Sequence, residues 1–144
     1  WLAEHLDDGD IRVLDCTTFN RPDGNGGIRA EGGRGSWEKE HIPGAGHADL
    51  LNDLSDKTAS FRYMVPPVEQ FTKAMSGYGV GVGTRAVLYD SSSGSWATRI
   101  WWMLRALGFD DACILNGGLY KWKLEGRPLS TRASEYPPAQ ELLH

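Results

Sequence analysis

The chain has 144 residues, of which 40% are hydrophobic and 24% charged, so it has the size and composition of one folded domain and is not a disordered chain. Its 15 Lys and Arg against 19 Asp and Glu give a net charge of −4, opposite in sign to most nucleic-acid-binding domains. No apolar run approaches the ~18 residues of a membrane span. We therefore expect neither a nucleic-acid partner nor a membrane span.

The first part of the chain contains one clear strand and a long segment without periodicity. Residues 2–6 are typical of the end of a helix, and the chain starts at Trp1 rather than Met, which leaves an upstream signal peptide open. The apolar run 11–16 predicts a short buried strand. Residues 17–46 hold eight of the 18 glycines and predict a loop with one helical turn at 36–40. The sequence does not indicate what this loop does.

The remainder of the chain alternates strands with helices. The expected elements are a strand at 46–50, a polar irregular segment at 52–64, a helix that starts at Pro66 and Pro67, a strand at 85–90, a helix at 95–107, a strand at 112–115 and a helix at 119–125. This order predicts right-handed βαβ units. The fold class is therefore α/β, with three α/β/α layers around a central, mostly parallel sheet.

The turn between the strand at 85–90 and the helix at 95–107 is the main candidate site, because ligands of open α/β sheets bind where strands end and helices begin. Two interpretations are open: its amides hold an anion at the helix N-terminus, or its Asp and Ser side chains cap the helix. The candidate residues are Asp90, Ser91, Ser92, Ser93, Gly94, Ser95 and Trp96.

Other catalytic motifs do not fit this turn. It lacks the G-x-S-x-G of a hydrolase elbow and the lysine of a Walker loop. An Asp90-centred phosphoryl-transfer site lacks companion acidic residues for Mg²⁺. His41 and His47 have no third ligand nearby, and Asp15 either caps the following loop or forms an acid–base pair with Asp90. We therefore expect no metal site and no cofactor.

Two cysteines, Cys16 and Cys113, lie 97 positions apart in apolar stretches and form no C-x-x-C pair. We expect both to be reduced, buried thiols. Neither spacing nor neighbours suggest a zinc site.

The helix at 95–107 offers a second clue. Its predicted core face is formed by Trp96, Ile100, Met103, Leu104 and Leu107. Trp101 and Trp102 are adjacent and point about 100° apart, so both cannot be central in one seam. With Arg99 and Arg105 they form the Trp–Arg combination that interface cores favour. The residues predict either a bulky core or an interface at Arg99, Trp101, Trp102 and Arg105.

Several ordered elements resemble the rhodanese domain. They are Val13-Leu-Asp15, His41-Ile-Pro-Gly-Ala45, Ala86-Val-Leu-Tyr-Asp90, the Gly94–Arg99 run, Trp101–Gly108, and Leu115-Asn-Gly-Gly-Leu-Tyr through to Pro128. The resemblance covers residues 1–131 and is weakest over 17–39. It implies transfer of a sulfane sulfur from thiosulfate or 3-mercaptopyruvate to a thiophilic acceptor, by a cysteine that begins the strand-to-helix loop and carries a persulfide.

This chain departs from the family at that cysteine, because Asp90 or Ser91 occupies its place. The resemblance therefore implies the catalytically silent N-terminal domain of a tandem sulfurtransferase, without catalytic residues of its own. Its partner would be a second rhodanese domain, with a small sulfur-containing anion as a further ligand.

Residues 132–144, with Pro137 and Pro138, then predict a polar tail or interdomain linker, and the expected location is the cytoplasm. The alternative is a free-standing rhodanese-like module that binds an anion or a peptide through the turn at 90–96.

Overall fold

The computed structural model describes residues 1–142 and contains a four-stranded parallel sheet in the order β4-β1-β5-β6. The strands are β1 (Ile11–Asp15), β4 (Gly46–His47), β5 (Arg85–Tyr89) and β6 (Ala112–Ile114). The central strands β1 and β5 pair along their whole length, from Ile11 with Arg85 to Asp15 with Tyr89. Both are buried on two faces, which explains their nearly continuous apolar sequences.

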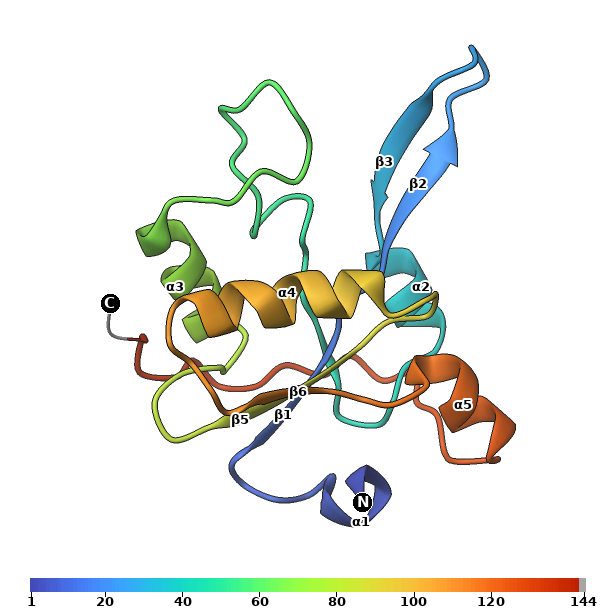
Figure 1. Ribbon diagram of the computed structural model, residues 1–144. Helices are drawn as coiled ribbons and strands as arrows, with labels where there is room; N and C mark the ends of the chain where they lie inside the picture. The colour runs from blue at the N-terminus through green and yellow to red at the C-terminus, as the bar shows by residue number, and fades with distance from the viewer. Residues whose placement is uncertain (143–144) are drawn as a thin grey trace.

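Helices cover both faces of the sheet (Figure 1). The helices α3 (Val68–Gly77) and α4 (Ser95–Ala106) pack on one face, around buried residues such as Leu14, Leu88 and Ile100. The short α1 (Leu2–His5) and α5 (Gly118–Leu124) pack on the other face, around residues that include Val13, Val87 and Trp122. The predicted α/β/α sandwich with a parallel sheet is confirmed.

The segment predicted as a loop over 17–46 is more ordered than expected. It contains an antiparallel hairpin of β2 (Thr18–Pro22) and β3 (Ile28–Gly32), followed by α2 (Arg34–Lys39). Figure 1 shows the hairpin extending away from the sheet. Most of its residues are exposed, so they carry no apolar alternation that would predict strands. Its turn holds an Asp-Gly and an Asn-Gly pair, which are typical hairpin signals.

Two further elements and the burial of one cysteine differ from the prediction. The strand expected at 46–50 is only two residues long, although Ala48 and Leu50 beyond it are fully buried. The helix expected from Pro66 begins at Val68, with Pro67 as its N-cap. Cys113 is exposed rather than buried, because β6 is an edge strand, whereas Cys16 is buried; both thiols are free.

The tail from residue 132 to Leu142 returns across the domain; residues 143 and 144 lie outside the described part of the chain. The Tyr136 hydroxyl accepts a hydrogen bond from the Val13 amide at 2.9 Å, and Ala139 exchanges hydrogen bonds with Ser76. Leu142 is buried in the core. This tail thus packs on the domain, and its predicted role as a linker to further chain stays a prediction.

Candidate functional site

The turn after β5 is organised by the carboxylate of Asp90, which is 1% exposed. Its Oδ1 accepts the amides of Ser92 at 2.9 Å and Gly94 at 3.0 Å, and its Oδ2 accepts the amide of Ala97 at 3.0 Å. Ala97 lies in the first turn of α4, where backbone N–H groups have no partner within the helix. Asp90 therefore caps α4, and its negative charge lies at the positive end of the helix dipole.

Neighbouring elements hold this turn in place. The Thr17 hydroxyl accepts the Ser91 amide at 3.0 Å, which joins the turn to the end of β1. Gly94 is the N-cap of α4 and has φ +90°. On the other side, a Cβ at Gly118 would lie 2.7 Å from the Asp90 carbonyl oxygen, so only glycine allows α5 to start this close to the turn.

A cavity of about 490 Å³ lies beside the turn. Its lining combines residues 89–98 with residues 114–120, among them Asn116 and the exposed Tyr120. The lining residues include no Lys, Arg or His, and Asp90 is their only acidic member. An anion that entered this cavity would meet one carboxylate and no cationic side chain.

Not every amide of the turn is engaged. Within the described residues, the amides of Ser95 and Trp96 donate no hydrogen bond, while the side chains of Ser93 and Ser95 bond each other at 3.2 Å. Ser91, Gly94 and Trp96 are partly buried, and Ser92, Ser93 and Ser95 are exposed. The predicted residues are thus together in one turn, but the carboxylate of Asp90 takes the amides that converge inside it.

Asp15 and Asp90 lie at the ends of the neighbouring strands β1 and β5, and their carboxylates accept hydrogen bonds from different amides. Asp15 is 1% exposed and accepts the Thr17 amide at 2.9 Å, so it caps the turn after its own strand. Burial raises the pKa of Asp15, while hydrogen bonds from Thr17 and the nearby His47 act in the opposite direction.

The surroundings of the two cysteines raise the pKa of both thiols. Cys16 is fully buried, and its pKa is raised well above the usual value by burial and by the charges of Asp15 and Asp90. Burial also raises the pKa of Cys113, on the edge strand β6. A reactive cysteine combines a lowered pKa with an accessible sulfur, whereas here the pKa of both thiols is raised.

His41 and His47 both lie beside the ring of Trp37. His41 is fully buried, stacks on Trp37 at 4.8 Å and makes a 2.7 Å hydrogen bond through Nδ1 to the Trp37 carbonyl. Trp37 also lies 6.2 Å from the ring of His47. No group of three His, Cys, Asp or Glu side chains among residues 1–142 could hold a metal ion, and no helix in that range could span a membrane.

The four predicted interface residues on α4 differ in their surroundings. Trp101 is partly buried and donates from Nε1 to the Ala112 carbonyl at 3.1 Å, so it belongs to the packing between α4 and β6. Trp102 is 50% exposed, with Arg99 stacked 5.7 Å from its ring centre. Arg105 is exposed and pairs with Asp110 at 3.1 Å.

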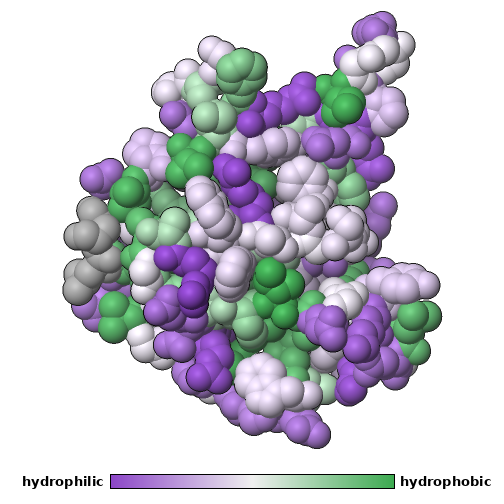
Figure 2. Space-filling view, viewed as in Figure 1, coloured by the Kyte–Doolittle hydropathy of each residue, from purple (hydrophilic) through white to green (hydrophobic). Residues whose placement is uncertain are grey.

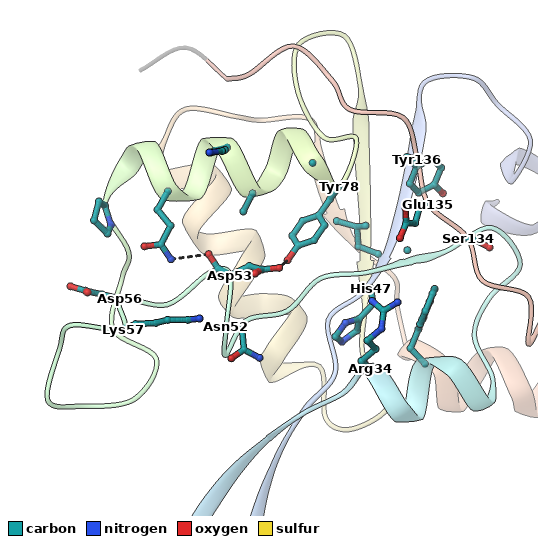
Figure 3. A pocket seen from close by; sticks show the side chains of 18 of the residues that line it. Arg34, His47, Asn52, Asp53, Asp56, Lys57, Tyr78, Ser134, Glu135 and Tyr136 are labelled. Atoms are coloured by element: carbon teal, nitrogen blue, oxygen red, sulfur yellow. Dashed lines mark hydrogen bonds between the residues drawn. The ribbon is translucent and has the colours of Figure 1, made fainter.

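A second cavity, of about 790 Å³, was not predicted. Figure 3 shows it as a groove that extends from the segment with Asp53, Asp56 and Lys57 to Arg34 and His47. The Tyr78 hydroxyl donates to Asp53 at 2.5 Å and accepts the Asp49 amide. The lining comes from α2, α3, β4, the following segment and the tail, so no local spacing in the sequence could have revealed it.

The whole-chain comparisons agree with this architecture. Residues 1–125 match the rhodanese-like domain family. The chain is 35% identical over 140 residues to the 3-mercaptopyruvate sulfurtransferase of Escherichia coli, which covers 97% of this chain and 48% of that protein. It is 32% identical over 145 residues to the thiosulfate sulfurtransferase of Cricetulus griseus, covering 96% of this chain and 46% of that protein.

A solved structure is equally similar. The crystal structure of SseA from Escherichia coli, described as a 3-mercaptopyruvate sulfotransferase with the rhodanese fold, superposes with a TM-score of 0.83 at 33% identity and covers 100% of this chain and 53% of that chain. The chain spans about half the length of the curated relatives that it matches. By its sequence and its fold, the chain belongs to the rhodanese-like domain family.

Proposed function

We propose that this chain is the catalytically silent N-terminal domain of a tandem sulfurtransferase, in which a second domain transfers sulfane sulfur from thiosulfate or 3-mercaptopyruvate. In this proposal it supports the partner domain and shapes the mouth of its active site. The observation that carries the proposal is the carboxylate of Asp90, which accepts three amides of the turn where active members are expected to hold their cysteine.

The chemistry of the turn supports the proposed catalytic silence in two ways. A carboxylate cannot accept a sulfane sulfur to form a persulfide, and its charge repels an anionic donor such as thiosulfate. In addition, the three amides that could lower a thiol pKa or hold the donor already hydrogen-bond within the protein. Cys16, which follows the neighbouring strand β1, is buried, and its pKa is raised.

The test is the formation of thiocyanate from thiosulfate and cyanide by the 144-residue chain. We expect a rate equal to that of buffer alone, for the wild type and for Cys16→Ser and Cys113→Ser alike. Turnover above the blank that disappears in either cysteine variant would overturn the proposal, since it would identify a working sulfur carrier.

A second candidate function is a free-standing rhodanese-like module that binds an anion or a peptide. It is favoured by the amides of Ser95 and Trp96, which donate no hydrogen bond within the described residues. The parent reading frame separates the two candidates. A frame that continues into a second domain with a Cys-x-x-Gly loop supports the tandem sulfurtransferase, and a stop near His144 supports the module.

A further inference from the structure

Large exposed apolar side chains gather on one flank of the molecule, beside the turn of Asp90. Phe61 is 77% exposed, Met64 47% and Val65 49%, all on the segment between β4 and α3, and Trp102 on α4 is 50% exposed. We call these four residues the Trp102 patch. Figure 2 shows green side chains over the segment between β4 and α3 on the face that also presents α4.

Tyr63 fixes the segment that carries three of these side chains. It has φ +61°, a conformation that costs energy for any residue with a Cβ. Its hydroxyl donates to Asn20 at 2.8 Å, its carbonyl accepts from Arg99, and its ring packs edge-on against Trp96 at 5.3 Å. With Tyr63 held inward by three contacts, Phe61 and Met64 are displayed outward on a fixed backbone.

The composition of the patch is that of an interaction surface. Its centre combines Phe, Met and Trp with Arg99, the residue types enriched where proteins bind one another. The stretches 61–65 and 98–102 contain Arg62 and Arg99 and no acidic residue. A matching partner surface therefore has an apolar centre and acidic residues at its rim.

We propose that the Trp102 patch binds the second domain of the parent chain, an inference that rests on the proposed function. The relatives are about twice as long as this chain, which leaves a domain-sized remainder to cover a surface of this kind. The patch also adjoins the turn of Asp90 through the contact of Tyr63 with Trp96.

The assignment differs from the interface predicted from sequence. It keeps Arg99 and Trp102, and it leaves out Trp101, which packs inward, and Arg105, which pairs with Asp110. It adds three residues of a segment that the sequence predicted only as irregular. Two other exposed apolar residues, Val82 before β5 at 52% and Leu124 on α5 at 69%, lie outside the patch and provide matched controls.

The experiment compares two double variants in the complete parent chain: Phe61→Ser/Trp102→Ser in the patch and Val82→Ser/Leu124→Ser outside it. Hydrogen exchange is followed at the amides of 59–66 and 98–104, and thermal unfolding is recorded by calorimetry. We expect the patch variant to raise exchange in both stretches at least tenfold and to separate one unfolding transition into two. The control variant should leave both measurements at wild-type values.

Three results would overturn the proposal. The first is equal behaviour of the two double variants. The second is a parent reading frame that stops near His144. The third is self-association of the 144-residue chain that Phe61→Ser/Trp102→Ser abolishes, because the occupant would then be a second copy. The cyanide assay on the 144-residue chain is independent of these results, so failure of the interface and failure of catalytic silence are told apart.

Discussion

Two aspartates lie at the same edge of the sheet, Asp15 at the end of β1 and Asp90 directly after β5. They are equally buried, but their carboxylates accept different numbers of hydrogen bonds from backbone amides. Asp90 accepts three backbone amides at the start of a 12-residue helix, whereas Asp15 accepts one, in a turn that leads into the hairpin. Burial raises the pKa of Asp15 despite its hydrogen bonds. Burial alone therefore does not define a site: three amides converge on the carboxylate of Asp90 and make it the centre of its turn, whereas Asp15 accepts a single amide.

The largest expected effect is that of Asp90→Ala. This substitution leaves three turn amides without their charged acceptor, and we expect a loss of about 3 kcal/mol in the free energy of unfolding. Asp15→Ala, which removes the acceptor of one amide, should cost about 1 kcal/mol. Urea denaturation of both variants checks the difference, and equal losses would show that the two carboxylates are equivalent after all.

Tyr89→Phe tests the support of Asp15 without changing Asp90. The Tyr89 hydroxyl accepts the Ile42 amide at 3.1 Å and hydrogen-bonds the Asp15 side chain. Since its loss leaves a buried amide unpaired, we expect about 1.5 kcal/mol of destabilisation in the same denaturation experiment. Tyr120→Phe, at a 69% exposed position, is the control and should be neutral. If Tyr89→Phe left the free energy of unfolding unchanged, the Tyr89 hydroxyl would not be a support of this turn.

The smallest effect is a pH dependence at Asp15. Its pKa is raised in the folded protein above the usual 3.8, so folding favours the protonated form. The stability from this group is therefore complete below the unfolded pKa and lost as pH rises through the folded pKa. As the pH falls from 7 to 4, the wild type should become more stable relative to Asp15→Asn. The expected gain is about 1.4 kcal/mol for each unit by which the pKa of Asp15 differs between the folded and the unfolded protein. Parallel stability curves, or curves that diverge in the opposite direction, would contradict this assignment.

The parallel sheet and its helices were predictable because β1, β5 and α4 have strong apolar patterns that local structure follows directly. The hairpin was missed because exposed strands such as Thr18–Pro22 need no alternation, and the Asp-Gly and Asn-Gly signals lie within a glycine-rich run. In the site, the sequence placed Asp90 and the serines in one turn. It could not show that the Asp90 carboxylate reaches Ala97, seven positions on, because that contact depends on how α4 is seated on the sheet.

The 790 Å³ groove and the three residues of the Trp102 patch on the segment between β4 and α3 escaped prediction for a similar reason. Each depends on segments far apart in sequence, and Tyr63 illustrates the difficulty. Nothing in the neighbouring residues indicates a left-handed tyrosine, and the conformation is held by Asn20 on β2 and by Trp96 and Arg99 on α4. Long-range contacts of this kind have no local sequence signal.

The most direct test of the central claim, that Asp90 occupies the amides of its own turn, is a titration of the chain with thiosulfate followed by amide NMR. We predict that the amide resonances of Ser92, Gly94 and Ala97 do not shift in the wild type and shift on titration in Asp90→Ala. Saturable shifts of these three resonances in the wild type would show that an anion reaches the turn while Asp90 is present, and would contradict the claim.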